Sequence, residues 1–284
     1  MVSFNSREGV IMEIVFLGTG SPLPDPNRAG PAMLVKAGPH HLLFDAGRGV
    51  VMRMAAAGTG PALVSGLFLT HLHSDHTTDV NDVITTRWVM SPAQNPLQVF
   101  GPVTTAGYID ATLAMLSEDI SYRLAHHEDL NWAPPVVVSE VTDGVVFEAD
   151  GVRVIAAPTD HAPVHPTVGY RIEHEGRSLV LAGDTVPCEG LDRLCAGADM
   201  YVQTVLRRSL VEQIPMQRFL DTMDYHSSTH QTGQTAARAS VGKVVLTHMV
   251  PAPFPGTEHE WIAEVAEAYD GPVVIAEDLL VLDV

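Results

Sequence analysis

The chain has 284 residues, 46% of them hydrophobic, and its 16 Lys and Arg against 34 Asp and Glu give a formal net charge of −18. This length and hydrophobic content suffice for one α/β domain with a large core over residues 1–284. The sequence has no run of 18 apolar residues and no basic segment followed by an apolar stretch, which argues against a membrane partner and secretion and predicts a cytoplasmic protein. Cys188 and Cys195 are not in CxxC spacing and are expected to be reduced thiols.

The first predicted elements are strands that end in polar or glycine-containing turns. Residues 14–18 are an apolar run before Thr19 and Gly20, and Phe44-Asp45-Ala46-Gly47 ends a later strand. A third apolar run, 67–70, leads into His71-Leu72-His73-Ser74-Asp75-His76. Because α/β folds gather functional residues on the loops that follow strands, this turn is the first candidate site.

The histidine-rich turn fits a pair of metal ions. Alternation along an extended segment places His71 and His73 on one face, so both can bind one ion while Asp75 and His76 turn toward a second. Imidazole and carboxylate together suit zinc or another divalent first-row ion.

Helices are expected between this turn and the middle of the chain. Residues 79–88 carry apolar side chains near helical spacing, and 107–115 continue helical after Gly101-Pro102. Because 77–135 is longer than two crossover helices require, we expect a helical cover beside the active site in this stretch, serving as a lid or partner surface.

Three later strands also end in residues that can bind a metal. They are followed by His161 after 152–157, by Asp184 in a Gly-Asp-Thr turn, and by His248 after 244–247. A lone histidine at a strand end is more often structural than a ligand, so only the joint order of these residues along the chain indicates a metal site.

The HxHxDH turn, the FDxG element and the GDT turn together resemble the metallo-β-lactamase superfamily, in particular its ribonuclease Z and arylsulfatase-like branch. The resemblance extends nearly end to end and implies an αββα sandwich, in which two central mixed sheets are flanked by helices. It also implies two divalent ions about 3.5 to 4 Å apart, zinc in the first place, with manganese or iron as alternatives. Carried over residue by residue, it implies His71, His73 and His161 on the first ion, Asp75, His76 and His248 on the second, and Asp184 bridging both.

His165 competes with His161 for one ligand position, because the two lie four residues apart. His161 is preferred because it ends its strand as the other ligands do, and because arylsulfatase-like members show a similar run with only the first histidine retained. His165 is then either a solvated loop residue or a group that faces the substrate.

His226-Ser227-Ser228-Thr229 resembles the His-Ser-Thr element of ribonuclease Z, whose histidine lies beside the leaving group. A departing alkoxide needs a proton and imidazolium can supply one, so His226 is predicted to be the general acid, while Asp75 orients the attacking hydroxide. Alternatively, Ser227 or Ser228 caps a helix over 229–240 and His226 only precedes it. Both roles can hold together.

The end of the chain predicts one more helix and two closing strands. Thr257-Glu258-His259-Glu260 has the pattern of a capping box, and Gly271-Pro272 ends the helix that follows. The last strands, within 273–284, are expected to close the second sheet.

Charge and spacing argue against the polyanion that ribonuclease Z handles. Arg207-Arg208 is the single Lys/Arg cluster, and the 22 residues between His161 and Asp184 leave no room for the flexible arm that many ribonuclease Z proteins insert there to grip tRNA. The family's Ser-x-Arg-Tyr after His248 is also replaced, by Met249-Val250-Pro251-Ala252. We therefore expect tRNA to be a poor substrate and a small anionic ester to be the better one.

Four functions follow in order of preference. The first is a binuclear metallohydrolase that acts on a phosphodiester, and the second is an arylsulfatase on the same site. A lactone or thioester hydrolase and a tRNA 3′-processing endoribonuclease come next. A non-catalytic metal-binding module is disfavoured because structural zinc sites are closed, whereas this ligand set leaves an open position. The sequence leaves a monomer and a homodimer equally open.

Overall fold

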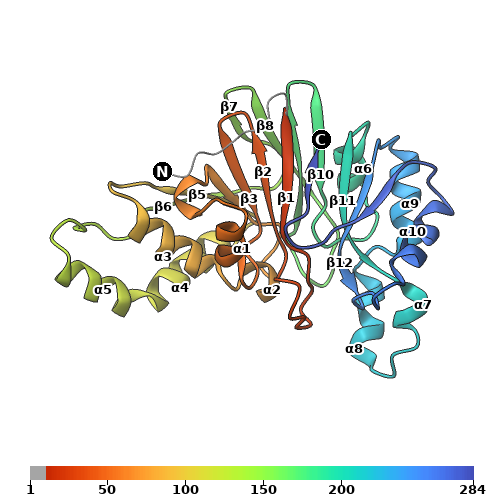
Figure 1. Cartoon of the computed structure of the whole chain (residues 1–284), viewed down its shortest axis with the longest axis horizontal. Coiled ribbons are helices and arrows are strands. Elements are labelled where there is room, and N and C mark those ends of the chain that lie inside the picture. The colour runs from red at the N-terminus through yellow and green to blue at the C-terminus, as the bar shows by residue number, and fades with distance from the viewer. Residues whose placement is uncertain (1–10) are drawn as a thin grey trace.

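Two seven-stranded sheets, packed face to face, organise the computed structural model, which describes residues 11–284 (Figure 1). The first sheet has the order β14-β1-β2-β3-β4-β5-β6 and the second β13-β12-β11-β10-β9-β8-β7. The strands of the first sheet are β1 (Met12–Gly18), β2 (Ala32–Ala37), β3 (His40–Phe44), β4 (Gly66–Phe68), β5 (Leu97–Gly101), β6 (Val136–Glu140) and β14 (Val281–Asp283). Those of the second are β7 (Gly144–Ala149), β8 (Val152–Pro158), β9 (Val168–His174), β10 (Arg177–Leu181), β11 (Met200–Leu206), β12 (Val244–Val250) and β13 (Val273–Ile275).

An aromatic stack holds the two sheets together. The rings of Phe44, Phe68 and Phe100 stack across neighbouring strands of the first sheet, with centroids 4.9 and 4.7 Å apart. Tyr170 from the second sheet meets Phe68 edge to face at 5.7 Å. These rings lie in a buried cluster to which both sheets contribute, and burying side chains of this size supplies a large share of the hydrophobic stabilisation.

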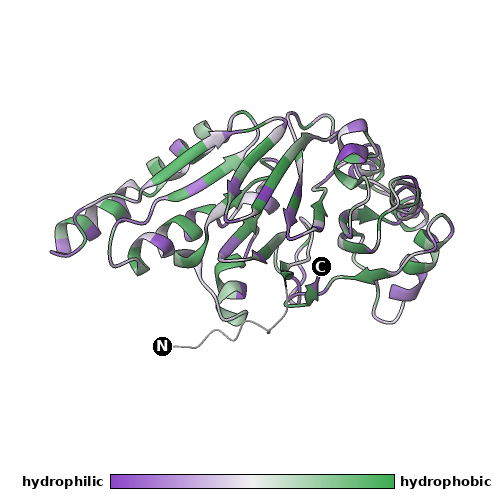
Figure 2. Cartoon of the chain, turned by 90° about the horizontal axis from the view of Figure 1, so that it is seen from above, coloured by the Kyte–Doolittle hydropathy of each residue, from purple (hydrophilic) through white to green (hydrophobic). Residues whose placement is uncertain are grey.

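Helices cover the outer face of each sheet. Apolar residues of α1, α3 and α4 pack on the first sheet, and those of α6, α9 and α10 pack on the second. Figure 2 shows the resulting pattern, with predominantly hydrophobic strands and helices that carry both kinds of side chain. The helices are α1 (Val50–Ala56), η1 (Pro61–Leu63), α2 (Ser74–Thr77), α3 (Val80–Met90), α4 (Thr105–Met115), α5 (Ser117–His126), α6 (Glu189–Cys195), α7 (Arg208–Val211), α8 (Gln217–Leu220), η2 (Asp221–Asp224), α9 (Thr229–Arg238) and α10 (Glu258–Ala266). Within the described residues, none of these helices combines the length and the apolar character that crossing a membrane requires.

This architecture confirms the αββα sandwich with two mixed sheets, but two sequence predictions about its parts are wrong. The stretch 77–135 is not purely a helical cover, because 97–101 form β5 inside the first sheet. The last strand, β14, does not close the second sheet, because it pairs antiparallel with β1. In both cases the hydrophobic pattern was compatible with several partners, and long-range pairing chose between them.

The two predicted helix caps have opposite outcomes. Ser228 accepts from the backbone N–H of Gln231, whose side chain in turn accepts from the Ser228 N–H, so the capping box of α9 is present. The capping box predicted at Thr257 is wrong. Its hydroxyl donates to the Phe254 carbonyl oxygen, and the carboxylate of Glu260 pairs with Arg207.

Two glycines allow the loops of one sheet edge to close around the candidate site. A Cβ on Gly47 would lie 2.4 Å from the backbone oxygen of Asp75. A Cβ on Gly183, whose φ is +66°, would lie 2.9 Å from the side chain of Thr70. The FDxG and GDT elements therefore need glycine so that the backbones of different loops can approach each other.

Candidate binuclear metal site

Both sheets contribute side chains to one cluster of histidine and aspartate. The loop after β4 carries His71 and His73, and the short helix α2 carries Asp75 and His76. The loops after β8 and β10 and the strand β12 supply the remaining three predicted ligands, which are His161, Asp184 and His248. The structure thus brings together all seven residues that the sequence predicted as metal ligands.

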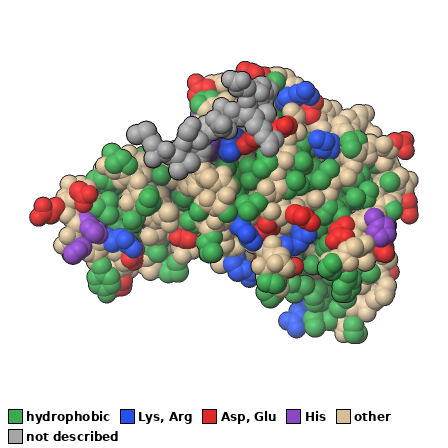
Figure 3. All heavy atoms as spheres, in the orientation of Figure 1, with side chains coloured by type: hydrophobic (Ala, Val, Ile, Leu, Met, Phe, Trp, Pro, Cys, Tyr) green, Lys and Arg blue, Asp and Glu red, His purple; other side chains and the backbone are tan. Residues whose placement is uncertain are grey.

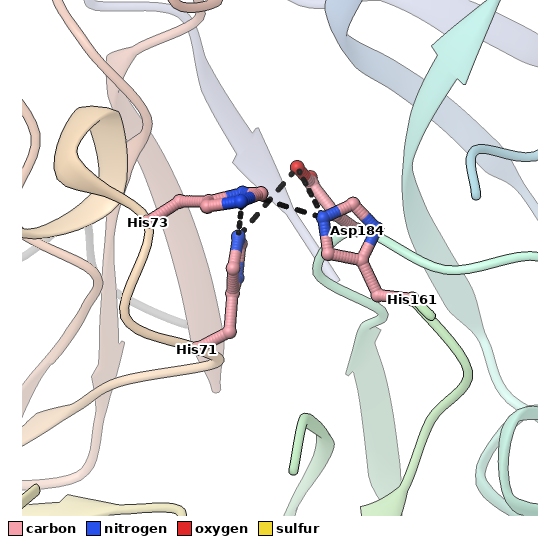
Figure 4. Close-up of side chains that lie close together, drawn as sticks. All are labelled: His71, His73, His161 and Asp184. Carbon is pink, nitrogen blue, oxygen red and sulfur yellow. Dashed lines mark hydrogen bonds and ion pairs between the residues drawn. The ribbon is translucent and has the colours of Figure 1, made fainter. Parts of the chain in front are cut away.

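Four of the seven form the first group, and they approach from opposite sides of the site (Figure 4). One ligand atom of each of His71, His73, His161 and Asp184 lies within 4.8 Å of the others. The Nε2 atom of His71 is 3.1 Å from Nδ1 of His73 and 3.8 Å from Oδ2 of Asp184. Such spacing lets these side chains surround a single cation.

Asp75, His76 and His248 form the second group, again within 4.8 Å of one another. The Nε2 atom of His248 is 3.2 Å from Oδ2 of Asp75. The Oδ2 atom of Asp184 is 3.4 Å from Nε2 of His76 and 3.7 Å from Nε2 of His248. Asp184 therefore lies between the two groups, within reach of both.

Asp45 orients one side of the second group. The Nδ1 atom of His76 donates to Oδ2 of Asp45 over 2.8 Å, and the backbone N–H of Thr70 donates to Oδ1 over 2.8 Å. Asp45 has φ of +56°, a conformation that costs a non-glycine residue free energy and is found at functional sites. The FDxG element contains Asp45, but no role was predicted for this residue, although its position at the end of a strand was the available signal.

The rings of His71 and His161 are oriented in the same way. The Nδ1 atom of His71 is 3.0 Å from the Thr70 hydroxyl, which itself donates to Asp45. The Nδ1 atom of His161 donates to the backbone oxygen of Tyr225 over 2.8 Å. Because each Nδ1 carries the proton, each Nε2 presents its lone pair to the site, which is the arrangement that metal-binding histidines adopt.

Burial and the mutual charges of the cluster shift its titration. Burial lowers the pKa of His71 well below its usual range and that of His161 to about 4. Burial also acts to lower the pKa of His76, but Asp184 and Asp45 outweigh it and hold this pKa well above the usual value. For Asp184, burial acts to raise the pKa, and the imidazoles of His248, His76 and His226 hold it well below instead.

Two buried polar atoms show that a cation fits this cluster. Nε2 of His76 and Oδ1 of Asp184 are buried and have no hydrogen-bond partner among the described residues. Leaving such an atom unpaired costs about 1 to 3 kcal/mol, and more for a charged group. The unpaired atoms belong to side chains that converge on the same point, so the donor set suits divalent metal ions.

His226 lies closer to the cluster than the sequence could indicate. Its Nε2 atom is 3.2 Å from Oδ2 of Asp184, and its Nδ1 atom is 3.2 Å from the backbone oxygen of Thr222. Together with Asp184 and His248 it forms a third group whose ligand atoms lie within 4.8 Å of one another. A ligand role for His226 is therefore a geometric alternative to the predicted acid role. His165, in contrast, is exposed and does not line the pocket over the cluster.

A pocket of about 540 Å³ opens directly over the cluster. Asp75, Asp184, His226 and His248 form its floor, and segments before β2 and after β11 form its walls. Most of the wall is apolar, with Leu23, Phe219 and Val250 among its residues. This volume falls in the range of roughly 300 to 1,000 Å³ that ligand-binding sites occupy.

Comparisons with known proteins agree on the family. Residues 40–249 match the model of the beta-lactamase superfamily domain. Ribonuclease Z of Mycolicibacterium gilvum (strain PYR-GCK) is 54% identical over 271 residues, which are 95% of both chains. Ribonuclease Z of Mycobacterium bovis (strain BCG / Pasteur 1173P2) is 52% identical over 95% of this chain and 97% of the relative. Among solved structures, the short form of human tRNase Z has a TM-score of 0.71 at 22% identity, covering 95% of this chain and 98% of that chain.

These relatives overturn the prediction about tRNA and leave the arylsulfatase alternative without support. The prediction that tRNA is a poor partner is wrong, because relatives named Ribonuclease Z are 54% identical to the chain over nearly the whole length of both. Net charge was a misleading guide, since it sums over the whole surface while recognition depends on local contacts. Because the matched residues are 95% of both chains, the short spacing between His161 and Asp184 does not argue against tRNA as a substrate. The arylsulfatase alternative finds no support in the same relatives.

Proposed function

Because the chain belongs to the metallo-β-lactamase superfamily as a member of the ribonuclease Z family, and is a metal-dependent hydrolase, we propose that it is an endoribonuclease that removes the 3′ trailer of tRNA precursors. The observation that carries this proposal is the pairing of the near full-length match with a cluster of seven histidine and aspartate ligands under an open pocket. A tRNA precursor would be met in the cytoplasm, the compartment that the sequence predicts.

Two divalent ions, zinc before manganese or iron, are the proposed cofactors. His71, His73 and His161 would hold one, Asp75, His76 and His248 the other, and Asp184 both. When bound, such ions supply a water activated at neutral pH and neutralise charge on the scissile phosphate.

Asp75 is proposed to orient the attacking water. Its Oδ2 atom lies 3.2 Å from Nε2 of His248 and 3.6 Å from Nε2 of His76, and its side chain lines the pocket floor. Its carboxylate can accept a hydrogen bond from the water, so that the water's lone pair faces the phosphorus. Orientation of this kind lowers the barrier because the reacting atoms meet in a productive geometry.

His226 is proposed to protonate the leaving oxygen. Its ring lines the pocket, and its Nδ1 atom faces the carbonyl of Thr222, a contact that needs a proton on that nitrogen. The proton on Nε2 is then the one that can be transferred. The attacking water gives up one proton to solvent and its oxygen bonds to phosphorus. The bond from phosphorus to the 3′ oxygen breaks, and that oxygen takes the proton from His226.

The proposed function is tested on a precursor tRNA with a 3′ trailer. Purified protein loaded with zinc or manganese is expected to release the trailer at a single site, and p-nitrophenyl sulfate should be turned over far more slowly than bis-p-nitrophenyl phosphate. Hydrolysis of the small diester with an uncut precursor would mean a different phosphodiester substrate. Turnover of the sulfate ester alone would contradict phosphodiesterase activity altogether.

A further inference from the structure

The segment 207–225 projects beside the pocket and carries a basic side chain that the rest of the fold does not use. Arg207 pairs with Glu260 and Glu264, and Arg208 pairs with Glu212. Arg218, on α8, makes no ion pair with any described residue and lines the pocket instead. Of three arginines in one segment, two are therefore neutralised locally and the third is available to a ligand.

Arg218 is also the only Lys or Arg among the described residues that line this pocket. Elsewhere on the visible face, Lys and Arg are scattered among acidic side chains and form no continuous basic stripe (Figure 3). A polyanion would thus find little general attraction on this face. Its phosphates would depend on the metal site and on Arg218.

The wall around Arg218 suits a base more than a second phosphate. Met216, Phe219 and Tyr225 lie on the same segment and line the pocket, with Leu23 among the other lining residues. Met216 and Leu23 are 46% and 43% exposed, and Figure 3 shows hydrophobic side chains gathered at the lower right, where Figure 1 places α7 and α8. Bases stack on aromatic side chains whatever their sequence.

We infer that Arg218 and Phe219, both on α8, grip an unpaired nucleotide next to the scissile bond, with Arg218 on its phosphate and Phe219 against its base. The pocket volume of about 540 Å³ suits a short unpaired segment rather than a whole stem. Arg218 therefore acts as a positioning residue for single-stranded RNA. This inference rests on the proposed function, since it concerns the same substrate at the same site.

The charge contact is tested by the salt dependence of precursor cleavage. In Arg218→Ala, kcat/KM should fall about tenfold, mainly through KM, and the slope of log kcat/KM against log salt should shrink by roughly 0.7, the value for one contact to a single strand. Arg218→Lys keeps the charge and should keep the slope. Arg208→Ala is the matched control, because it removes the same charge from the same segment at a residue that is paired and does not line the pocket.

The base contact needs a second pair of measurements. Phe219 also packs against the cluster of Leu206, Val211 and Val250, so Phe219→Leu is used because it keeps an apolar side chain there. This variant should have a KM about tenfold higher on normal RNA. The increase should be much smaller on RNA with an abasic residue beside the scissile bond. Metal content and the thermal unfolding midpoint of each variant show whether the site and the fold are intact.

The outcomes separate this inference from the proposed function. If the wild-type protein leaves the precursor uncut, the proposed function has failed. If the wild-type protein cuts it and Arg218→Ala matches Arg208→Ala in KM and salt slope, only the inference has failed. A loss in Arg218→Ala that appears in kcat together with lost metal would also overturn it, because the residue would then be structural.

Discussion

Histidine and aspartate gather at both ends of the sandwich, yet only one of these gatherings can bind metal. At the end opposite the pocket, the β2–β3, β7–β8 and β9–β10 turns meet. There, the Nδ1 atom of His40 is 3.2 Å from Oγ of Ser65, and its Nε2 atom is 3.0 Å from Oδ2 of Asp150. The Nδ1 atom of His174 lies 3.2 Å from the carbonyl oxygen of Gly151. Both ring nitrogens of His40 are therefore occupied by the protein itself.

At the pocket end, each oriented imidazole uses one nitrogen for support and keeps the other for the site. His76 is held by Asp45 through Nδ1, and its buried Nε2 has no hydrogen-bond partner among the described residues. The number of histidines in a region therefore says little about metal binding. What distinguishes the two ends is whether supporting residues leave convergent lone pairs free.

Removing the carboxylate proposed to bridge the two ions should have the largest effect at the pocket end. Asp184→Ala is expected to lose one or both of about two ions per chain and at least ~10³-fold in diesterase activity, because both groups share this side chain. Asp150→Ala, at the opposite end, should keep both ions. Elemental analysis and turnover of bis-p-nitrophenyl phosphate measure both quantities, and an Asp184→Ala protein that binds two ions with full activity would refute the bridging role.

Replacing the proposed acid should affect rate without affecting metal. His226→Ala is expected to keep both ions but to lose roughly 10²- to 10⁴-fold on substrates with poor leaving groups, the usual range for general acid catalysis. The loss should be far smaller with p-nitrophenolate, which departs without a proton. The measurement is kcat/KM across esters of rising leaving-group pKa together with metal content. An equal loss across the series would contradict the acid role, and loss of an ion would favour the ligand alternative.

Weakening the support of one histidine should have an intermediate effect. Asp45→Asn keeps the size of the side chain but removes the carboxylate that holds His76, and it should cost about 10- to 100-fold in metal affinity or activity. Asp150→Asn is the control, since it removes the carboxylate from His40, whose partly exposed pair is worth less than about 1 kcal/mol. Competition with a metal chelator compares the two, and equal metal affinities would mean that Asp45 supports the fold only.

The smallest expected effect lies at the end opposite the pocket and depends on pH. Burial, followed by the nearby Lys36, lowers the pKa of His41 below its ordinary value of 6.5. The unfolded chain therefore binds the proton more readily, so His41 lowers stability as pH falls below 6.5 and has no effect above it. His41→Gln should reduce this acid destabilisation, because glutamine does not bind the proton. Urea unfolding of both proteins at pH 7.5 and 5.5 checks this, and an unchanged pH difference would contradict it.

The sequence by itself carried the motifs whose resemblance implies the αββα sandwich, and it named the histidines and aspartates that gather beneath the pocket. Alternating and continuous apolar runs predicted the strands, and polar residues at their ends predicted one functional edge, because strands of a sheet bring their ends together. The spacing in His71-Leu72-His73-Ser74-Asp75-His76 also indicated two groups of ligands, since local backbone geometry decides which neighbours face together.

Only the tertiary structure decided which contacts distinguish these residues from other histidines. Three of these contacts join segments that are far apart in the chain. Asp45 supports His76, the Tyr225 carbonyl supports His161, and β14 lies beside β1. The pairing of Arg207 with Glu260 and Glu264 likewise joins residues more than 50 positions apart. Sequence patterns report periodicity and order, whereas these pairings follow from the packing of two sheets and are not encoded in any local segment.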